Sequence, residues 1–206
     1  MSISFKLGVA YEEAADYVSV IGLEKLKLTN AQDYKRVAKC GETEYYSKFI
    51  AIQEMINNKP VKIVKRNAFA KTQVEGVSLP KSIKIIESNA FRDCTALKSL
   101  IISDGLTRIE SNAFRNCTDL RVVQLPKSVK FIGNQAFQNC ESLELMKFSE
   151  GLEEIGSEAL RECYSLKTVT LPKSLRKIGY GVFMECSVFL RVEGRSLSER
   201  QRYGGR

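Results

Sequence analysis

The chain has 206 residues, of which 44% are hydrophobic, and this is enough apolar material for a buried core. Its 32 Lys and Arg outnumber its 24 Asp and Glu, giving a net charge of +8, and it contains no His, which removes the commonest near-neutral acid/base catalyst and the commonest metal ligand. No apolar stretch approaches the roughly 20 residues of a membrane-spanning helix. We expect a non-enzymatic protein with no catalytic residue, cofactor or metal site.

The first residues lack the basic start, apolar run and small-residue cleavage site of a secretion signal. As written, the sequence therefore predicts a cytoplasmic protein.

Residues 1–60 do not repeat and are predicted to form a mixed α/β N-terminal cap. Within them, Tyr11–Tyr17 predicts the start of a short helix, Leu23–Leu28 predicts a strand, and Phe49–Ile52 predicts a strand followed by a turn. A separate functional domain is the alternative.

That alternative includes an active site built from Glu12, Glu13 and Asp16. Their spacing is more typical of a solvated helix face.

A 23-residue period begins after the cap, with a first, irregular copy near Val61. Its clearest column is cysteine, at Cys94, Cys117, Cys140, Cys163 and Cys186. Three positions earlier lies an apolar column with Phe91, Phe114, Phe137, Leu160 and Phe183. Each repeat is predicted to be one turn of a coil that buries its apolar columns only by stacking on its neighbours.

The second half of each repeat reads L-x-x-L-x-L, and the alternation of its last apolar positions predicts a strand with one buried face. A double period of 46 residues lies over the single one. Alternate turns carry Leu-Pro-Lys-Ser, at residues 79–82, 125–128 and 171–174, while the turns between them carry Ser-Asp-Gly or Ser-Glu-Gly.

The residues at 125–143 carry the pattern Leu-Pro-x-Ser-Val-x-x-Ile-Gly-x-x-Ala-Phe-x-x-Cys-x-x-Leu, which resembles the BspA-like class of leucine-rich repeat. The resemblance covers about residues 61–194. It implies a right-handed, curved solenoid of the α/β class, with a parallel sheet on one face and a shorter strand or turn-like element opposite. It also implies a protein that binds other proteins, host matrix components or carbohydrates, and a secreted or cell-surface location.

The thiols should form a line with one per turn, whereas a metal site needs ligands that converge on one point. We therefore expect a ladder of buried, free cysteines.

Two further columns invite a functional interpretation. The polar residues before each Ala-Phe pair, such as Asn89, Asn112 and Gln135, are expected to cap a short helical turn. The glycines at 133, 156 and 179 predict either a turn with positive φ or tight packing.

The residues between the apolar strand positions should project from the outer face of the sheet. They are Ser99, Ile101, Val122, Gln124, Leu145, Lys147, Thr168 and Thr170. Ile101, Val122 and Leu145 would form a diagonal apolar strip with a charged rim, which is the usual anatomy of a protein-binding patch. We predict that a protein partner binds there, with scattered surface hydrophobic residues as the alternative.

A stripe of Arg92, Arg115 and Arg161 could bind nucleic acid or another polyanion together with the basic tail at 195–206. Sparse aromatic residues and neighbouring acids argue against it. The strand predicted around Phe189–Val192 leaves an open edge, over which either the tail folds or another chain docks, which includes self-association.

Overall fold

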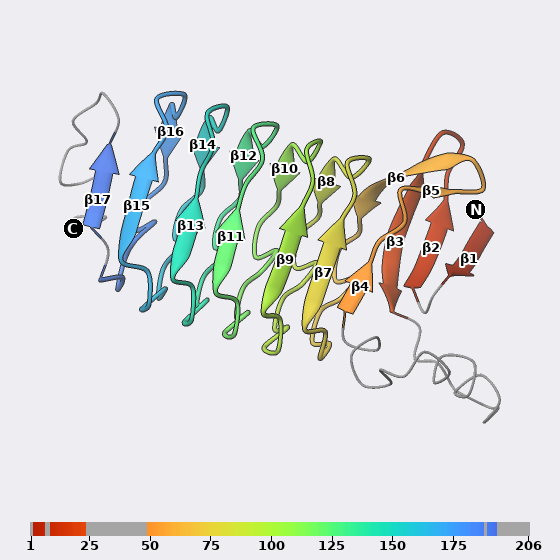
Figure 1. Ribbon diagram of the computed structural model, residues 1–206, viewed down its shortest axis with the longest axis horizontal. Helices are drawn as coiled ribbons and strands as arrows, with labels where there is room; N and C mark the ends of the chain where they lie inside the picture. Colours follow the sequence, from red (N-terminus) through yellow and green to blue (C-terminus); the bar gives the residue numbers. More distant parts are fainter. Residues whose placement is uncertain (1, 7–8, 24–48, 188, 193–206) are drawn as a thin grey trace.

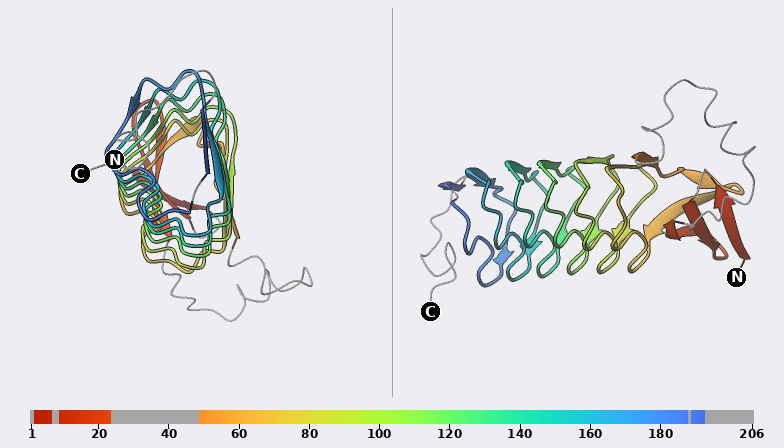
Figure 2. Two further views of the ribbon diagram at one scale, coloured as in Figure 1. Left: turned by 90° about the vertical axis from the view of Figure 1, so that its left-hand side faces the viewer. Right: turned by 90° about the horizontal axis from the view of Figure 1, so that it is seen from below.

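The computed structural model describes residues 2–6, 9–23, 49–187 and 189–192. These residues form strands and turns only, and the strands build a β-solenoid whose turns follow one another along a single axis (Figure 1). Seen along that axis, successive turns superpose (Figure 2). The predicted solenoid is confirmed, and the predicted α/β cap finds no support because the described part of the cap contains strands and no helix.

One row of strands lies in a ten-stranded sheet with the order β1-β2-β3-β6-β8-β10-β12-β14-β16, and β5 pairs with β6. The strands of the solenoid turns in this sheet have two residues each and pair in parallel: β8 Ile85–Ile86, β10 Arg108–Ile109, β12 Phe131–Ile132, β14 Glu154–Ile155 and β16 Lys177–Ile178. These are the short elements that the family resemblance implies.

The second row holds longer strands on the other side of each turn (Figure 1). It consists of β4 Phe49–Ala51, β7 Gly76–Leu79, β9 Ser99–Ile102, β11 Val122–Gln124, β13 Leu145–Lys147, β15 Thr168–Leu171 and β17 Phe189–Val192. These strands pair in parallel in two sheets, with the orders β4-β7-β9 and β11-β13-β15-β17. The 23-residue period sets the register of the inner pairs, as Val122 with Leu145, whereas the end pairs depart from it, with Phe49 opposite Gly76 and Thr168 opposite Phe189.

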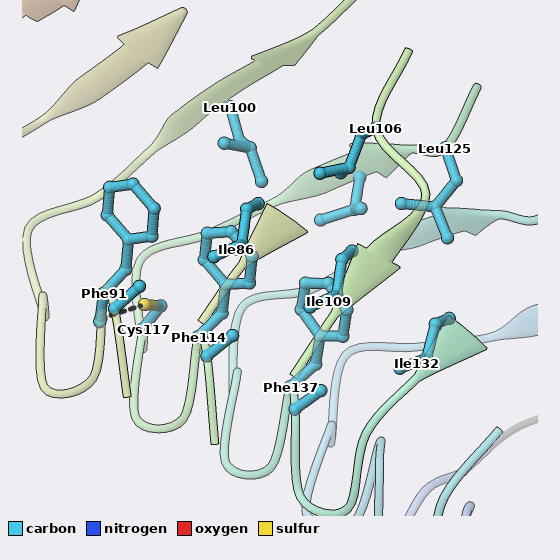
Figure 3. Packing of buried hydrophobic residues seen from close by; sticks show 14 of the residues in the cluster. Ile86, Phe91, Leu100, Leu106, Ile109, Phe114, Cys117, Leu125, Ile132 and Phe137 are labelled. Carbon is cyan, nitrogen blue, oxygen red and sulfur yellow. Dashed lines mark hydrogen bonds between the residues drawn. The ribbon is translucent and has the colours of Figure 1, made fainter. Parts of the chain in front are cut away.

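The core is continuous from turn to turn because equivalent apolar side chains lie on top of one another (Figure 3). Phe69, Phe91, Phe114 and Phe137 stack face to face, with ring centroids 4.8, 5.0 and 5.1 Å apart and interplanar angles of 1°, 2° and 5°. Phe183 closes the column in the last turn and is also buried. The stacking of Phe69 shows that the irregular first copy is a true turn of the solenoid.

The cysteine column forms the predicted ladder of free thiols, buried at Cys94, Cys117, Cys140 and Cys163 and half-buried at Cys186. Each thiol donates to a carbonyl oxygen of the preceding turn, as Cys117 Sγ does to Phe91 O at 3.2 Å. In the first turn Thr72 takes the place of the thiol and lies 3.5 Å from Cys94 Sγ. Burial raises the pKa of the Cys140 thiol to about 12. Burial also raises the pKa of Cys94 and Cys117, so these thiols are packing groups that stay protonated at neutral pH.

The expected helix caps before the Ala-Phe pairs are wrong. Asn89, Asn112 and Gln135 have φ of 60°, 57° and 56°, so they occupy the left-handed region within turns and not the N-cap of a helix. Asn is among the residues that tolerate this region best, because its short polar side chain can bond locally. The left-handed backbone conformation therefore accounts for the polar residues at these positions.

Tight packing, and not positive φ, explains the glycines at 133, 156 and 179. A Cβ added to Gly156 would lie 2.5 Å from both the backbone nitrogen and the Oδ1 of Asn134, and one added to Gly133 would lie 2.5 Å from Ser111 N. The missing side chain lets one turn approach the backbone of the turn before it.

We predict that Gly156→Ala lowers the free energy of unfolding by about 1–3 kcal/mol, because the added methyl group forces consecutive turns apart. Urea unfolding followed by circular dichroism measures the change. Ser111→Ala is the control, since its hydroxyl has no hydrogen-bond partner among the described residues, and it should cost less than about 0.5 kcal/mol. Equal losses in the two variants would contradict the packing role of Gly156.

The N-terminal segment extends the ten-stranded sheet. β1 Ser2–Lys6, β2 Val9–Glu13 and β3 Val18–Leu23 are antiparallel neighbours, and β3 pairs in parallel with β6 Lys59–Val64. The helix predicted at Tyr11–Tyr17 is wrong because β2 occupies its first half, where Tyr11 is fully buried. Pairing of β2 with β1 and β3 supplies backbone hydrogen bonds that outweigh a weak local helical preference.

The other predictions for this segment have mixed outcomes. The strand at Phe49–Ile52 is confirmed as β4, and the turn that follows joins β5 Met55–Ile56 to β6 through Asn57 and Asn58. Most of the strand predicted at Leu23–Leu28 lies outside the described residues. The domain boundary at residue 60 stays a prediction, and β6 runs across it.

At the other end, β17 pairs with β15 and is the last strand of its sheet, as predicted. No described strand pairs with its far edge. The basic tail at 195–206 lies outside the described residues, so its docking or self-association stays a prediction.

Candidate functional site

The row of long strands exposes the side chains that alternate with the buried core positions. Ser99, Ile101, Val122, Gln124, Leu145, Lys147, Thr168 and Thr170 are all exposed, and we call these eight residues the outer strand face. Ile101 is 51% exposed, and Val122 and Leu145 are each 47% exposed. The structure thus brings the eight predicted partner-binding residues onto one surface, while partner binding itself stays a prediction.

Two shallow depressions cover this face. The first has a volume of about 580 Å³ and is lined by residues of β9 and β11 and the corners that follow them. The second has a volume of about 410 Å³ and is lined by residues of β13 and β15 and their corners. Four residues of the outer strand face line the first depression, and the other four line the second.

The depressions are related by the 46-residue double period. Eight lining positions correspond at this offset, including Ile101 with Lys147, Asp104 with Glu150, and Pro126 with Pro172. Each depression spans one turn with an acidic Ser-Asp-Gly or Ser-Glu-Gly corner and one turn with a Leu-Pro-Lys-Ser corner. The double repeat therefore builds the same hollow twice, with different side chains at its centre.

The charges beside the outer strand face are mostly basic and unpaired. Arg121, Lys147 and Lys167 have no ion-pair partner among the described residues, whereas Lys98 Nζ lies 4.0 Å from Glu75 Oε2. Of the acids nearby, Glu150 accepts hydrogen bonds from the backbone amides of Lys173 and Ser174. Glu144 and Asp104 likewise have no ion-pair partner among the described residues, so free charges of both signs border this face.

One residue of this surface escaped the sequence analysis. Phe49, on β4, is 41% exposed and lies directly over Gly76, where an added Cβ would be 2.2 Å from the Phe49 ring. Both occupy the strand column that continues to Ser99 and Val122. Gly76 is the first residue of β7, and a glycine in a strand often marks a close approach of another group.

The arginine stripe is largely neutralised by its neighbours. Arg161 lies 3.0 Å from Glu185 and 3.2 Å from Glu162, and Arg92 lies 3.4 Å from Asp93. Only Arg115 of the three lacks an ion-pair partner among the described residues. Because two of the three arginines are paired with acids, this surface attracts a polyanion only weakly.

Other chemical sites find little support in the part of the chain that the structure describes. No three His, Cys, Asp or Glu side chains there form a group that could hold a metal ion. Glu13 is held by Lys59, with 2.6 Å between Nζ and Oε1. No helix in the described ranges is long and apolar enough to cross a membrane.

The fold and its exposed strand row define a β-solenoid built from leucine-rich repeats. Residues 62–189 match the BspA type leucine rich repeat region in six copies, and the chain belongs to this family. Repeats of this family are typically non-catalytic. None of the proteins with a curated description matches the sequence.

Solved structures share the fold. The leucine-rich repeat protein TpLRR of T. pallidum is 25% identical, with a TM-score of 0.71 and coverage of 94% of this chain and 92% of its own. The pneumococcal vaccine antigen PcpA is 24% identical, with a TM-score of 0.72, and the 94% of this chain that aligns spans half of PcpA. A leucine-rich cell surface protein of Faecalibacterium prausnitzii is 18% identical, with a TM-score of 0.62 and coverage of 95% and 56%. The chain thus shares its fold with these bacterial leucine-rich repeat proteins.

Proposed function

We propose that the chain is a non-catalytic interaction module that binds a protein partner through the outer strand face. The observation that carries the proposal is the apolar strip of Ile101, Val122 and Leu145, each about half exposed, on a rigid sheet. Exposed large apolar side chains that are contiguous and rimmed by polar groups are typical of binding surfaces. Phe49 adds an aromatic side chain at the N-terminal end of the same face.

The rigidity of this face supports the proposal. Its backbone is held by parallel pairing in two sheets, with the orders β4-β7-β9 and β11-β13-β15-β17, and its inward side chains, such as Val123 and Met146, are buried. A surface that is already ordered loses little conformational entropy when a partner binds.

Val122→Glu combined with Leu145→Glu should abolish partner binding without unfolding the chain, because both side chains point to solvent. The experiment captures partners from native lysate with wild-type and variant chains, and then measures the affinity of the identified partner for each. We expect at least a hundredfold loss, since two central contacts each become a desolvated charge. Arg92→Glu with Arg115→Glu, on the turns, is the matched control and should leave the affinity unchanged.

The converse result is equally informative. A partner that is lost with the arginine variant and kept with the strip variant would favour polyanion binding and overturn the proposal.

The compartment is a second, separate proposal. One solved relative is described as a cell surface protein and another as a vaccine antigen, which supports display of this module outside the cell, where the ligand could be matrix or carbohydrate. Surface labelling of intact source cells, followed by detection of the chain, tests the location. A signal found only after lysis would favour the cytoplasmic alternative.

A further inference from the structure

The spacing of the two depressions restricts the shape of a partner that fills both. Consecutive turns are about 5 Å apart, as the phenylalanine stack shows, and equivalent points of the depressions are two turns apart. A partner that enters both must therefore present two side chains on one face, about 10 Å from each other along the solenoid axis.

An α-helix lying along this axis meets the requirement. Residues seven positions apart on a helix share a face and are about 10.5 Å apart. An extended strand presents same-face residues about 6.7 or 13 Å apart, and neither value matches. A polyproline II segment presents residues about 9.3 Å apart, but such segments dock in grooves lined by aromatic side chains. The single aromatic residue lining either depression, Phe148, is buried.

The chemistry of the depressions differs at their centres. Ile101 and Val122 line the first, which suits an apolar side chain. At the position equivalent to Ile101 the second has Lys147, which has no ion-pair partner among the described residues and lies beside the hydroxyl-bearing Thr168 and Thr170. An acidic side chain would find a cation and hydroxyl donors there.

We propose that the partner segment is an amphipathic helix that runs along the solenoid axis across the strands. It places an apolar side chain in the first depression and an acidic side chain, seven positions away in either direction, in the second. The flank of this helix would meet Arg121, Glu144 and Lys167 in turn, which favours an acid, a base and an acid at the corresponding positions. The inference rests on the proposed function and specifies its partner.

A phage-displayed library of random peptides of about 18 residues, or five helical turns, tests the inference on the full chain. We expect the enriched sequences to share an apolar residue and an acidic residue seven positions apart. Their binding should fall at least tenfold with Val122→Glu and with Lys147→Glu. When the acid of a selected peptide is changed to Lys, affinity for the wild-type chain should fall, and affinity for the Lys147→Glu chain should recover.

The outcomes separate the two proposals. Enriched peptides whose binding is unchanged by Val122→Glu and by Leu145→Glu would overturn the proposed function together with the inference. Peptides that depend on these residues but carry alternating or Pro-x-x-Pro patterns, or that gain nothing in the charge reversal, would overturn only the helical partner. A library that yields no enriched sequence on the wild-type chain counts against the helix inference as well.

Discussion

Phe114→Ala is expected to lower the free energy of unfolding by about 3–5 kcal/mol. Phe114 is fully buried and stacks on Phe91 and on Phe137, at 5.0 and 5.1 Å (Figure 3). Its truncation leaves a cavity that consecutive turns cannot close, because their backbones are held apart by the hydrogen-bond ladders on both sides. Urea unfolding monitored by far-ultraviolet circular dichroism gives the change.

Phe49→Ala is the matched control for this prediction. The same atoms are removed, but the ring is 41% exposed, so we expect a loss well below that of Phe114→Ala. Comparable losses at the two positions would contradict the assignment of the phenylalanine column as the core of the stack.

Alkaline pH is expected to destabilise the fold more steeply than it does an ordinary domain. Burial raises the pKa of the thiols of Cys94, Cys117 and Cys140, for Cys140 from 9.0 to about 12. The pKa of Cys163 is raised by its hydrogen bond with Cys186 and by burial. Between the two pKa values the unfolded chain has lost the proton that the folded chain keeps, so the unfolded state binds fewer protons and stability falls as pH rises.

The size of the effect follows from linkage. Between pH 9 and its pKa in the folded chain, each such thiol lowers the free energy of unfolding by about 1.4 kcal/mol per pH unit. Well below pH 9 it has no effect on the pH dependence. For Cys140 this slope extends from pH 9 to its pKa in the folded chain, about 12.

The measurement is the free energy of unfolding between pH 7 and pH 11 in wild-type chain and in Cys140→Ala. At pH 7 the variant should have the lower free energy of unfolding, because it loses a buried group. Above pH 9 its free energy of unfolding should fall less steeply than that of the wild-type chain, and the difference in slope should equal the contribution of one thiol. Ionisation of Lys and Tyr affects both chains alike and cancels in the comparison. Parallel curves would show that the Cys140 proton is not coupled to folding.

Much of the solenoid could be predicted because its contacts repeat. A residue such as Phe114 meets the same residue type from the turns before and after it, so a column in the sequence is also a column in space. The outward direction of Val122 and Leu145 followed from the two-residue period of a strand in the same way.

The wrong or missed predictions concern residues whose contacts are not with the equivalent residue of a neighbouring turn. Tyr11 belongs to β2, which pairs with β3, and β3 in turn joins the sheet through β6, which lies far away in the sequence. Asn112 sits in a left-handed turn that resembles a helix cap in its pattern of polar and apolar residues. Phe49 reaches Gly76 across 27 positions of irregular spacing, which no column reveals.

The sequence by itself determined the repeat, the stacked core, the free thiol ladder and the residues of the outer strand face, because the 23-residue period encodes nearest-neighbour contacts. Only the tertiary structure decided that the cap is a β-extension of the sheet, that the glycines serve close approach, and that the face holds two equivalent depressions. Those features depend on how far apart turns lie and on what covers their ends. Distances between backbones are set by packing over the whole stack and are not written in any single repeat.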